Sequence, residues 1–133
     1  MLRVEAEVNP TEVQEKVEAA IKSIFPTITL VRVGNSLIGE STEVDSLARF
    51  YQLLRQQMIL DTARKVMMAN RKGNSTRMLL NKQVASVSRV SITNGESPLG
   101  PITVNLEAPD IERLIDYLVP RTRAGRPIRE IVY

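Results

Sequence analysis

The stretch from Asp45 to Asn70 contains neither glycine nor proline, and it constrains the fold of this 133-residue chain more than any other stretch. Leucine, arginine, glutamine, methionine and alanine dominate it, and all of these residues favour helices. Within this stretch, apolar residues recur every three to four positions up to Leu54 and again from Ile59 onwards, but the step between these two residues is five positions. The pattern therefore predicts one long helix with both faces covered, or two helices that break near Gln57.

Two expectations follow for the second half of this stretch. We expect Ile59, Leu60 and Val66 to be buried in the core, because they follow the helical spacing of apolar positions. Asp61 has two possible roles, since it could cap a second helix at its N-terminus or pair with a basic residue one turn later. The sequence leaves both roles open.

The N-terminal third has the pattern of a strand, a helix and a hairpin. Residues 2–8 alternate apolar and charged side chains, which predicts a strand with one buried face. Asn9-Pro10 then supplies an N-cap and a first-turn proline for an amphipathic helix that ends before Pro26. The apolar residues 28–33 and 37–39 flank a Gly-Asn turn, which predicts a hairpin.

The C-terminal half has the pattern of three strands and a helix. Residues 77–80, 87–93 and 102–106 are the expected strands, with residues 81–83 as a turn or a single helical turn. Residues 111–118 have helical spacing and are followed by a proline that stops the helix.

The predicted order is therefore β-α-β-β-α-β-β-β-α. This order is typical of an α+β fold, with helices packed on one face of a mostly antiparallel sheet. The length and the order of elements predict a single domain over residues 1–120. Residues 121–133 contain four arginines and form a basic C-terminal tail, which we expect to dock on a partner or to stay disordered.

Cysteine and histidine are both absent from the chain. Their absence excludes zinc sites built from these residues, thiol nucleophiles, Ser-His-Asp hydrolysis and histidine as a general base. Carboxylate-bound magnesium stays chemically possible, but no catalytic set is recognisable, so we predict no catalytic residue, no metal and no cofactor. The apolar runs are short and the N-terminus lacks the apolar core of a signal peptide, which predicts a cytoplasmic protein with no membrane contact.

Basic side chains are concentrated in the middle of the chain. Residues 49–89 carry nine basic and one acidic side chain, whereas residues 1–48 carry four basic and eight acidic ones. Such a block either attracts phosphates or complements the acidic parts of the same molecule. The candidate anion or RNA contacts in this block are Arg55, Arg64, Arg71, Lys72, Lys82 and Gln83.

Four short motifs occur in a fixed order, namely LLRQQMILDTAR (residues 53–64), LNKQVA (80–85), ESPLGPI (96–102) and PRT (120–122). Together they resemble an archaeal family catalogued as uncharacterised protein family 0201. The resemblance implies an intracellular archaeal protein, a fold similar to a ribosomal-protein RNA-binding domain, and a homodimer. It implies no reaction. Structural roles are expected for the motif residues Gln57, Asp61, Asn81, Ser97, Pro98 and Arg121.

The leading functional hypothesis is a non-catalytic binding module that acts through homodimerisation and protein contacts. It depends on the 43% apolar content of a small chain and on the lack of a recognisable catalytic set. An RNA-binding protein that uses a basic surface around residues 49–89 is the alternative. We narrowly expect no strong RNA binding, because base stacking has only five aromatic side chains to use: Phe25, Phe50, Tyr51, Tyr117 and Tyr133.

An enzyme that handles a phosphorylated substrate is the third hypothesis. Its site would combine Asp61 with the three cations Arg55, Arg64 and Lys82. The sequence offers no evident nucleophile or base with a tuned pKa beside them, so a non-catalytic protein is favoured.

Overall fold

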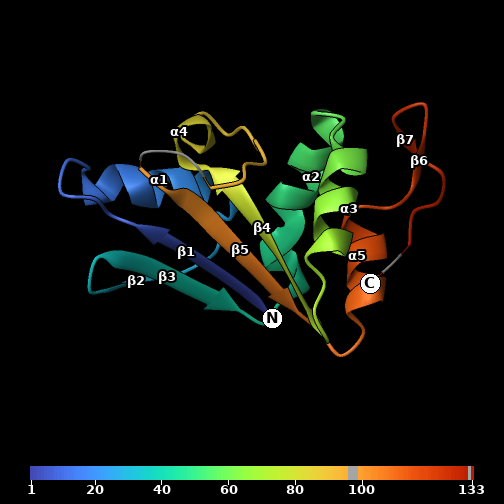
Figure 1. Ribbon diagram of the computed structural model, residues 1–133, viewed down its shortest axis with the longest axis horizontal. Coiled ribbons are helices and arrows are strands. Elements are labelled where there is room, and N and C mark those ends of the chain that lie inside the picture. The colour runs from blue at the N-terminus through green and yellow to red at the C-terminus, as the bar shows by residue number, and fades with distance from the viewer. Residues whose placement is uncertain (96–98, 132) are drawn as a thin grey trace.

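Five strands form one antiparallel sheet in the order β2-β3-β1-β5-β4 in the computed structural model, which describes residues 1–95, 99–131 and 133 (Figure 1). Val4 at the centre of the sheet lies opposite Gly39 of one neighbouring strand and Val104 of the other. Side chains alternate between a buried face and an open face along β1, β3, β4 and β5. The strands are β1 (Leu2–Glu7), β2 (Leu30–Val33), β3 (Ser36–Ser41), β4 (Ser75–Asn81) and β5 (Pro101–Glu107).

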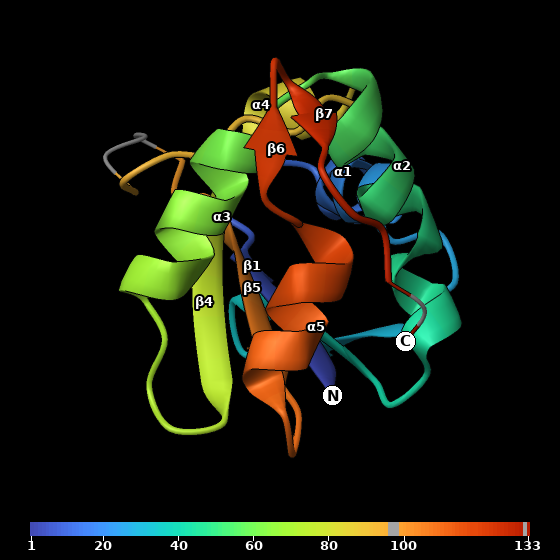
Figure 2. The same ribbon diagram turned by 90° about the vertical axis from the view of Figure 1, so that its right-hand side faces the viewer.

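Helices cover one face of this sheet, and Figure 2 shows two of them, α3 and α5, in front of β4 and β5. The predicted α+β fold, with helices on one face of an antiparallel sheet, is confirmed. No helix in the described part of the chain is long and apolar enough to cross a membrane. The helices are α1 (Gln14–Ile24), a 3-10 turn η1 (Val44–Leu47), α2 (Ala48–Gln56), α3 (Leu60–Ala69), the single turn α4 (Lys82–Ala85) and α5 (Ile111–Leu118).

The central helical stretch is broken into α2 and α3 at Met58, which has a positive φ of 56°. The break changes which side of the second helix is buried. In α3 the buried side chains are Leu60, Ala63 and Met67. Leu60 is buried as expected, but the prediction of a core position for Ile59 and Val66 is wrong, because both are only half-buried against the core.

The strand predicted for residues 87–93 is not formed. The chain turns after α4, and only Ile92 makes a single bridge, to Leu80. Around this bridge the Asn81 N–H donates to the Ser91 carbonyl (2.8 Å) and the Thr93 N–H donates to the Leu79 carbonyl (2.9 Å). The backbone of Val90 is instead bound by Gln57, the C-cap residue of α2, whose side-chain amide donates to the Val90 carbonyl (2.7 Å) and accepts from its N–H (2.8 Å).

The C-terminal tail folds back onto its own chain, in contrast to the disordered or partner-docked arm that we expected. It forms a hairpin of β6 (Thr122–Arg123) and β7 (Arg126–Pro127), which lies beside α3 in Figure 2. Gly125 at its turn has φ 78°, and a Cβ there would lie 2.8 Å from the Met58 side chain. The hairpin turn is thus packed against the break between α2 and α3.

Candidate functional site

The six predicted contact residues do not gather on one surface. Lys82 and Gln83 lie on α4, which packs against α1, whereas Arg55 and Arg64 face α5. Arg71 and Lys72 lie in the loop between α3 and β4. Most of these side chains are also occupied by contacts inside the protein.

Lys82 is a buried structural charge, with only 4% of its side chain exposed. Its Nζ lies 3.0 Å from the Glu12 carboxylate and donates to the carbonyls of Glu7 and Leu99, both at 2.7 Å. Burial raises the pKa of Glu12, but hydrogen bonds from Asn9 and the Lys82 ammonium outweigh it and lower that pKa below its usual value. Lys82 therefore has no exposed charge to offer to RNA.

The neighbours of Lys82 on α4 have separate roles. Asn81 caps α4, because its side-chain oxygen accepts from the Val84 N–H at 3.0 Å. Gln83 is exposed at the rim of a hollow of about 320 Å³ that Lys16 and Ser86 also line. Ser97 and Pro98, two further motif residues, lie outside the described part of the chain.

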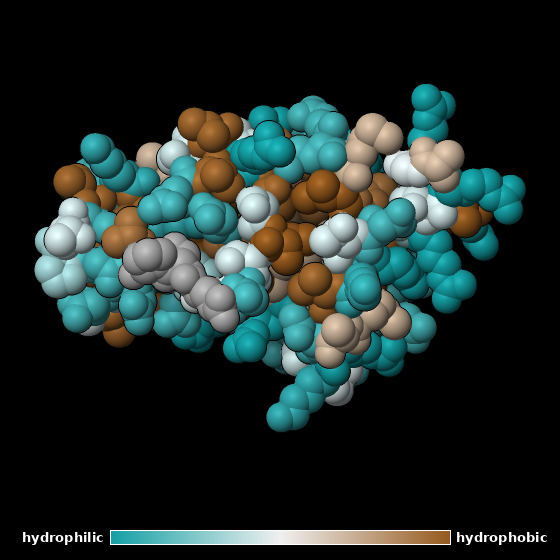
Figure 3. Space-filling model, turned by 45° about the horizontal axis from the view of Figure 1, so that its top comes forward, coloured by the Kyte–Doolittle hydropathy of each residue, from teal (hydrophilic) through white to brown (hydrophobic). Residues whose placement is uncertain are grey.

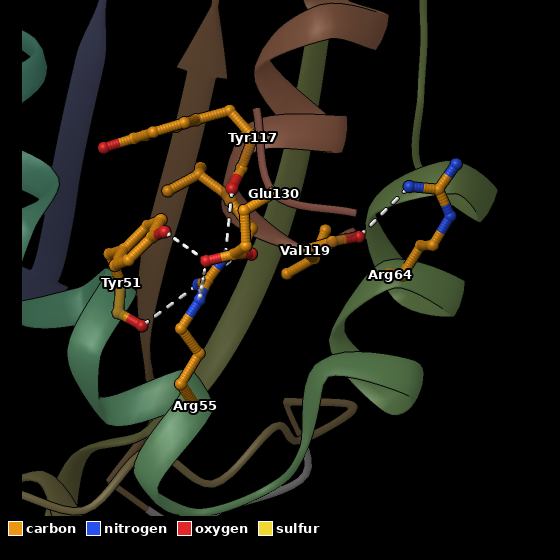
Figure 4. A network of polar contacts seen from close by, with 7 residues as sticks. Tyr51, Arg55, Arg64, Tyr117, Val119 and Glu130 are labelled. Carbon is orange, nitrogen blue, oxygen red and sulfur yellow. Dashed lines mark hydrogen bonds and ion pairs between the residues drawn. The ribbon is translucent and has the colours of Figure 1, made fainter. Parts of the chain in front are cut away.

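All five N–H donors of Arg55 are used within the chain (Figure 4). Nε and Nη2 bind the Glu130 carboxylate, at 3.2 and 2.8 Å, and the remaining bonds go to the carbonyls of Tyr51, Tyr117 and Leu118. The guanidinium also stacks over the Tyr51 ring, 3.4 Å from its centroid. Arg55 thus fastens the tail to α2 and α5, and it has no donor left for a ligand.

The Arg55 cluster perturbs two further groups. The hydrogen bond from Arg55 lowers the pKa of Glu130 despite partial burial, and the Tyr51 hydroxyl, which donates to Glu130 at 2.7 Å, acts in the same direction. Burial and that hydrogen bond raise the pKa of Tyr51 to about 12. The Glu130 carboxylate therefore stays ionised beside a Tyr51 hydroxyl that stays protonated.

The aromatic side chains are used inside the protein. Phe25 and Phe50 are fully buried and their ring centroids are 5.4 Å apart. Tyr117 stacks between Tyr51 and Tyr133, with ring centroids at 5.0 and 5.6 Å. Tyr51 and Tyr117 are partly buried in this stack, and only Tyr133 at its outer end is exposed, at 41%, so a nucleic-acid base has few free ring faces to stack on.

Arg64 links α3 to the end of α5. Its Nη1 lies 2.8 Å from the Asp116 carboxylate and 3.1 Å from the Val119 carbonyl, to which it donates. Asp61 takes neither role expected for it, because it accepts a hydrogen bond from the Thr122 hydroxyl of the tail, and the N-cap position of α3 is Ile59. The LLRQQMILDTAR and PRT motifs therefore meet at this point.

The loop between α3 and β4 carries the last two predicted cations. Arg71 pairs with Glu112 at 3.5 Å, and both side chains are exposed. Lys72 is exposed and pairs with no acidic side chain in the described part of the chain. An exposed pair such as that of Arg71 contributes little stability, so its charge stays accessible to a ligand.

Sequence reasoning missed a basic surface where α3, α5 and the tail meet, which we call the α3–tail groove. Two adjoining hollows of about 420 Å³ each share Arg64, Arg121 and Ile128. The tail arginines were the available signal, but only the fold places them beside α3. The basic and apolar side chains that line this groove include Arg64, Lys65, Met68, Arg121, Ile128 and Arg129.

The open face of the sheet has the opposite charge. Arg3 and Arg77 are its only cations in the described strands, and the acidic side chains outnumber them. Phosphates are repelled by such a face. The acidic side chains are Glu5, Glu7, Glu40 and Glu107.

Comparisons with known proteins agree with the resemblance of the motifs. A family model described as RNA binding matches residues 1–108. A UPF0201 protein of Sulfurisphaera tokodaii is 41% identical, over 96% of this chain and 92% of its own length. A UPF0200/UPF0201 protein of Archaeoglobus fulgidus is 39% identical over 98% of this chain but only 40% of its own length. The crystal structure of a UPF0201 protein from Methanococcus jannaschii matches with a TM-score of 0.87 at 33% identity, covering 96% of this chain and 98% of that one.

Proposed function

Because the chain belongs to the archaeal UPF0201 family, the uncharacterised protein family 0201, we propose that it is a non-catalytic RNA-binding module. The observation that carries this proposal is the match of the RNA-binding family model to residues 1–108, which include the whole five-stranded sheet. This reverses the order of our two leading hypotheses, since protein contacts were favoured on the apolar content of the chain and on the lack of a recognisable catalytic set.

The internal use of the aromatic rings supports a particular mode of RNA binding. Tyr117 is stacked on two other tyrosines, and Phe25 and Phe50 are buried. A binding mode based on splayed, stacked bases would need free rings. The proposed mode is therefore recognition of the shape and phosphates of structured RNA, which relies on cations.

Direct titration tests this function. A fluorescently labelled RNA hairpin, and a DNA duplex of the same length, are titrated with the full chain at several salt concentrations. We expect the RNA hairpin to bind more tightly than the DNA, with an affinity that falls linearly on a log-log plot against salt. The proposal is overturned if the hairpin does not bind at low salt, or if polyphosphate of equal charge displaces it as effectively as unlabelled RNA does.

We further propose that two copies of the chain pair through β2, and one specific observation supports this second function. β2 is an edge strand, and its side chains Val31 and Val33 are each 59% exposed. Natural edge strands usually protect themselves with charges or prolines, because unpaired backbone groups recruit further strands. β2 carries one charge, Arg32, whose guanidinium donates to the Gln14 side chain, and the exposed valines on either side of it favour pairing with a second copy.

Sedimentation tests the homodimer. A stable interface should bury at least ~1,000 Å² in total, and the parent should then sediment as a dimer at micromolar concentration. Replacing both Val31→Lys and Val33→Lys should give a folded monomer, while the control Val87→Lys, which changes another exposed valine, should remain dimeric. A monomeric parent would contradict the proposal.

A further inference from the structure

The α3–tail groove contains three cations that form no ion pair within the described part of the chain. Lys65, Arg121 and Arg129 are exposed, and none forms an ion pair with another described residue. In contrast, Arg55 and Lys82 have their charges satisfied inside the protein. Exposed cations that line two adjoining hollows and pair with no described acidic side chain are able to neutralise several neighbouring phosphates.

Arg64 lies at the floor of this groove, with 14% of its side chain exposed. Asp116 and the Val119 carbonyl both bind its Nη1, which fixes the guanidinium in one position. The Nε and Nη2 atoms of Arg64 donate to no described residue, so these donors of its guanidinium group are not used by the chain itself. An arginine held in this way loses little side-chain entropy when it binds a phosphate oxygen.

The acidic side chains around the groove are occupied. Asp116 pairs with Arg64, Glu112 pairs with Arg71, and Asp61 accepts from the Thr122 hydroxyl. Asp116 and Glu112 are each offset by an arginine, whereas Asp61 keeps its charge because its Thr122 partner is neutral. The four cations that line the two hollows, Arg64, Lys65, Arg121 and Arg129, still outnumber these three acidic side chains.

Apolar side chains lie directly beside these cations. Ile128 is 62% exposed and Met68 is 36% exposed, and both line the same hollow as Lys65 and Arg121. Figure 3 shows exposed apolar side chains interspersed with hydrophilic ones on one face of the molecule. Apolar contacts next to phosphate-binding cations suit the sugar faces of a nucleic-acid backbone, which a free inorganic anion does not have.

We propose that the α3–tail groove is a phosphate-backbone site for RNA, with Lys65, Arg121 and Arg129 as direct contacts and Arg64 as a fixed donor at its floor. This inference rests on the proposed RNA-binding function and assigns its surface. The RNA-binding family model matches residues 1–108, whereas the proposed site also includes Arg121 and Arg129 of the tail.

Three contacts hold the tail in this position. Glu130 is bound by Arg55, Thr122 donates to Asp61, and Gly125 lies against Met58. The groove therefore forms only when the hairpin is docked.

Matched charge-removal variants test the site. Lys65→Gln, Arg121→Gln and Arg129→Gln are combined in one variant. Lys16→Gln, Lys22→Gln and Arg89→Gln form the control, which removes three exposed charges from α1 and from the loop after α4, at positions that do not line the α3–tail groove. All six side chains are exposed, so both variants should fold, and equal melting temperatures check this.

Three lost phosphate contacts should lower the salt slope by about two to three units, at roughly 0.7 to 0.9 per phosphate, and weaken binding by about 100-fold or more near 0.1 M salt. The control variant should change affinity by less than about threefold. If both variants weaken binding equally while the parent binds RNA, the α3–tail groove is not the RNA site, but the RNA-binding function stands. If the parent binds no RNA, both proposals fall.

Two further measurements use the parent chain alone. On RNA titration, the methyl signals of Met68 and Ile128 should shift, while that of Ile38, on the open face of the sheet, should not. Shifts at Ile38 alone would overturn the site. Displacement of RNA from the groove by an acidic peptide at equal charge concentration would assign the groove to a protein partner instead, and would also overturn it.

Discussion

The Lys82 ammonium lies 3.0 Å from the Glu12 carboxylate, and the two side chains are only 4% and 11% exposed. Lys82 also donates to the Leu99 carbonyl, so the contact joins the LNKQVA and ESPLGPI motifs. A buried ion pair contributes little compared with apolar packing, but removing one partner leaves an uncompensated charge. Lys82 thus connects α4 both to Glu12 and to the loop before β5, and losing its charge should disturb both contacts.

Replacing Lys82→Met should destabilise the protein by about 3–5 kcal/mol, because the buried Glu12 carboxylate loses its cation. Adding Glu12→Gln should recover part of this loss, since the remaining amide carries no charge. Urea unfolding of the parent, both single variants and the double variant measures the coupling. Lys65→Met, at an exposed position, is the control and should be nearly neutral. Purely additive effects would show that the two side chains do not interact.

Stability should decrease in acid because the pKa values of Glu12 and Glu130 are both lowered from the ordinary value of 4.5. A carboxyl group with a lowered folded pKa stabilises the fold fully above its unfolded pKa, and this contribution is lost as pH falls through the folded pKa. The free energy of unfolding should therefore decline from about pH 5 downwards. Glu12→Gln should flatten this decline, and an unchanged profile would exclude Glu12 as its source.

Arg55→Ala should destabilise the fold more than Glu130→Gln does. Arg55 also binds the carbonyls of Tyr117 and Leu118 at the end of α5, and bonds from charged donors each contribute about 1.5–3 kcal/mol. The Glu130 side chain is 47% exposed, so solvent screening limits the effect of its loss to about 0.2–1 kcal/mol. Thermal unfolding gives both values.

Proteolysis of folded protein provides a second readout for the same pair of variants. Both changes remove a tail contact, so the tail should be cleaved faster in each than in the parent. Equal stability of the two variants would mean that the carbonyl contacts of Arg55 contribute nothing.

Leu60→Ala and Ile59→Ala test the break between α2 and α3. Leu60 is 2% exposed, and its truncation should cost about 2–5 kcal/mol. Ile59 is half-buried and should cost clearly less, because part of its side chain already faces solvent. Chemical unfolding distinguishes the two, and an equal or larger effect at Ile59 would favour an unbroken helix.

The sequence by itself determined the sheet strands and most helices, because their signals are local. The alternation from Leu2 to Val8 gave β1, and the helical spacing from Ile111 to Leu118 gave α5. The four ordered motifs identified the family. The α+β class follows from these elements, since each amphipathic helix must cover an apolar sheet face.

Only the tertiary structure decided which cations are free. Along the sequence, Lys82 and Lys65 look alike, but Lys82 is surrounded by Glu12 and two carbonyls while Lys65 faces solvent. The same holds for residues 87–93, whose apolar pattern suits a strand, although the folded segment bridges β4 only at Ile92 and Gln57 binds the backbone of Val90. Partners separated by tens of residues leave no periodic signal, so burial, pairing and the docking of the tail emerge only when the chain is folded.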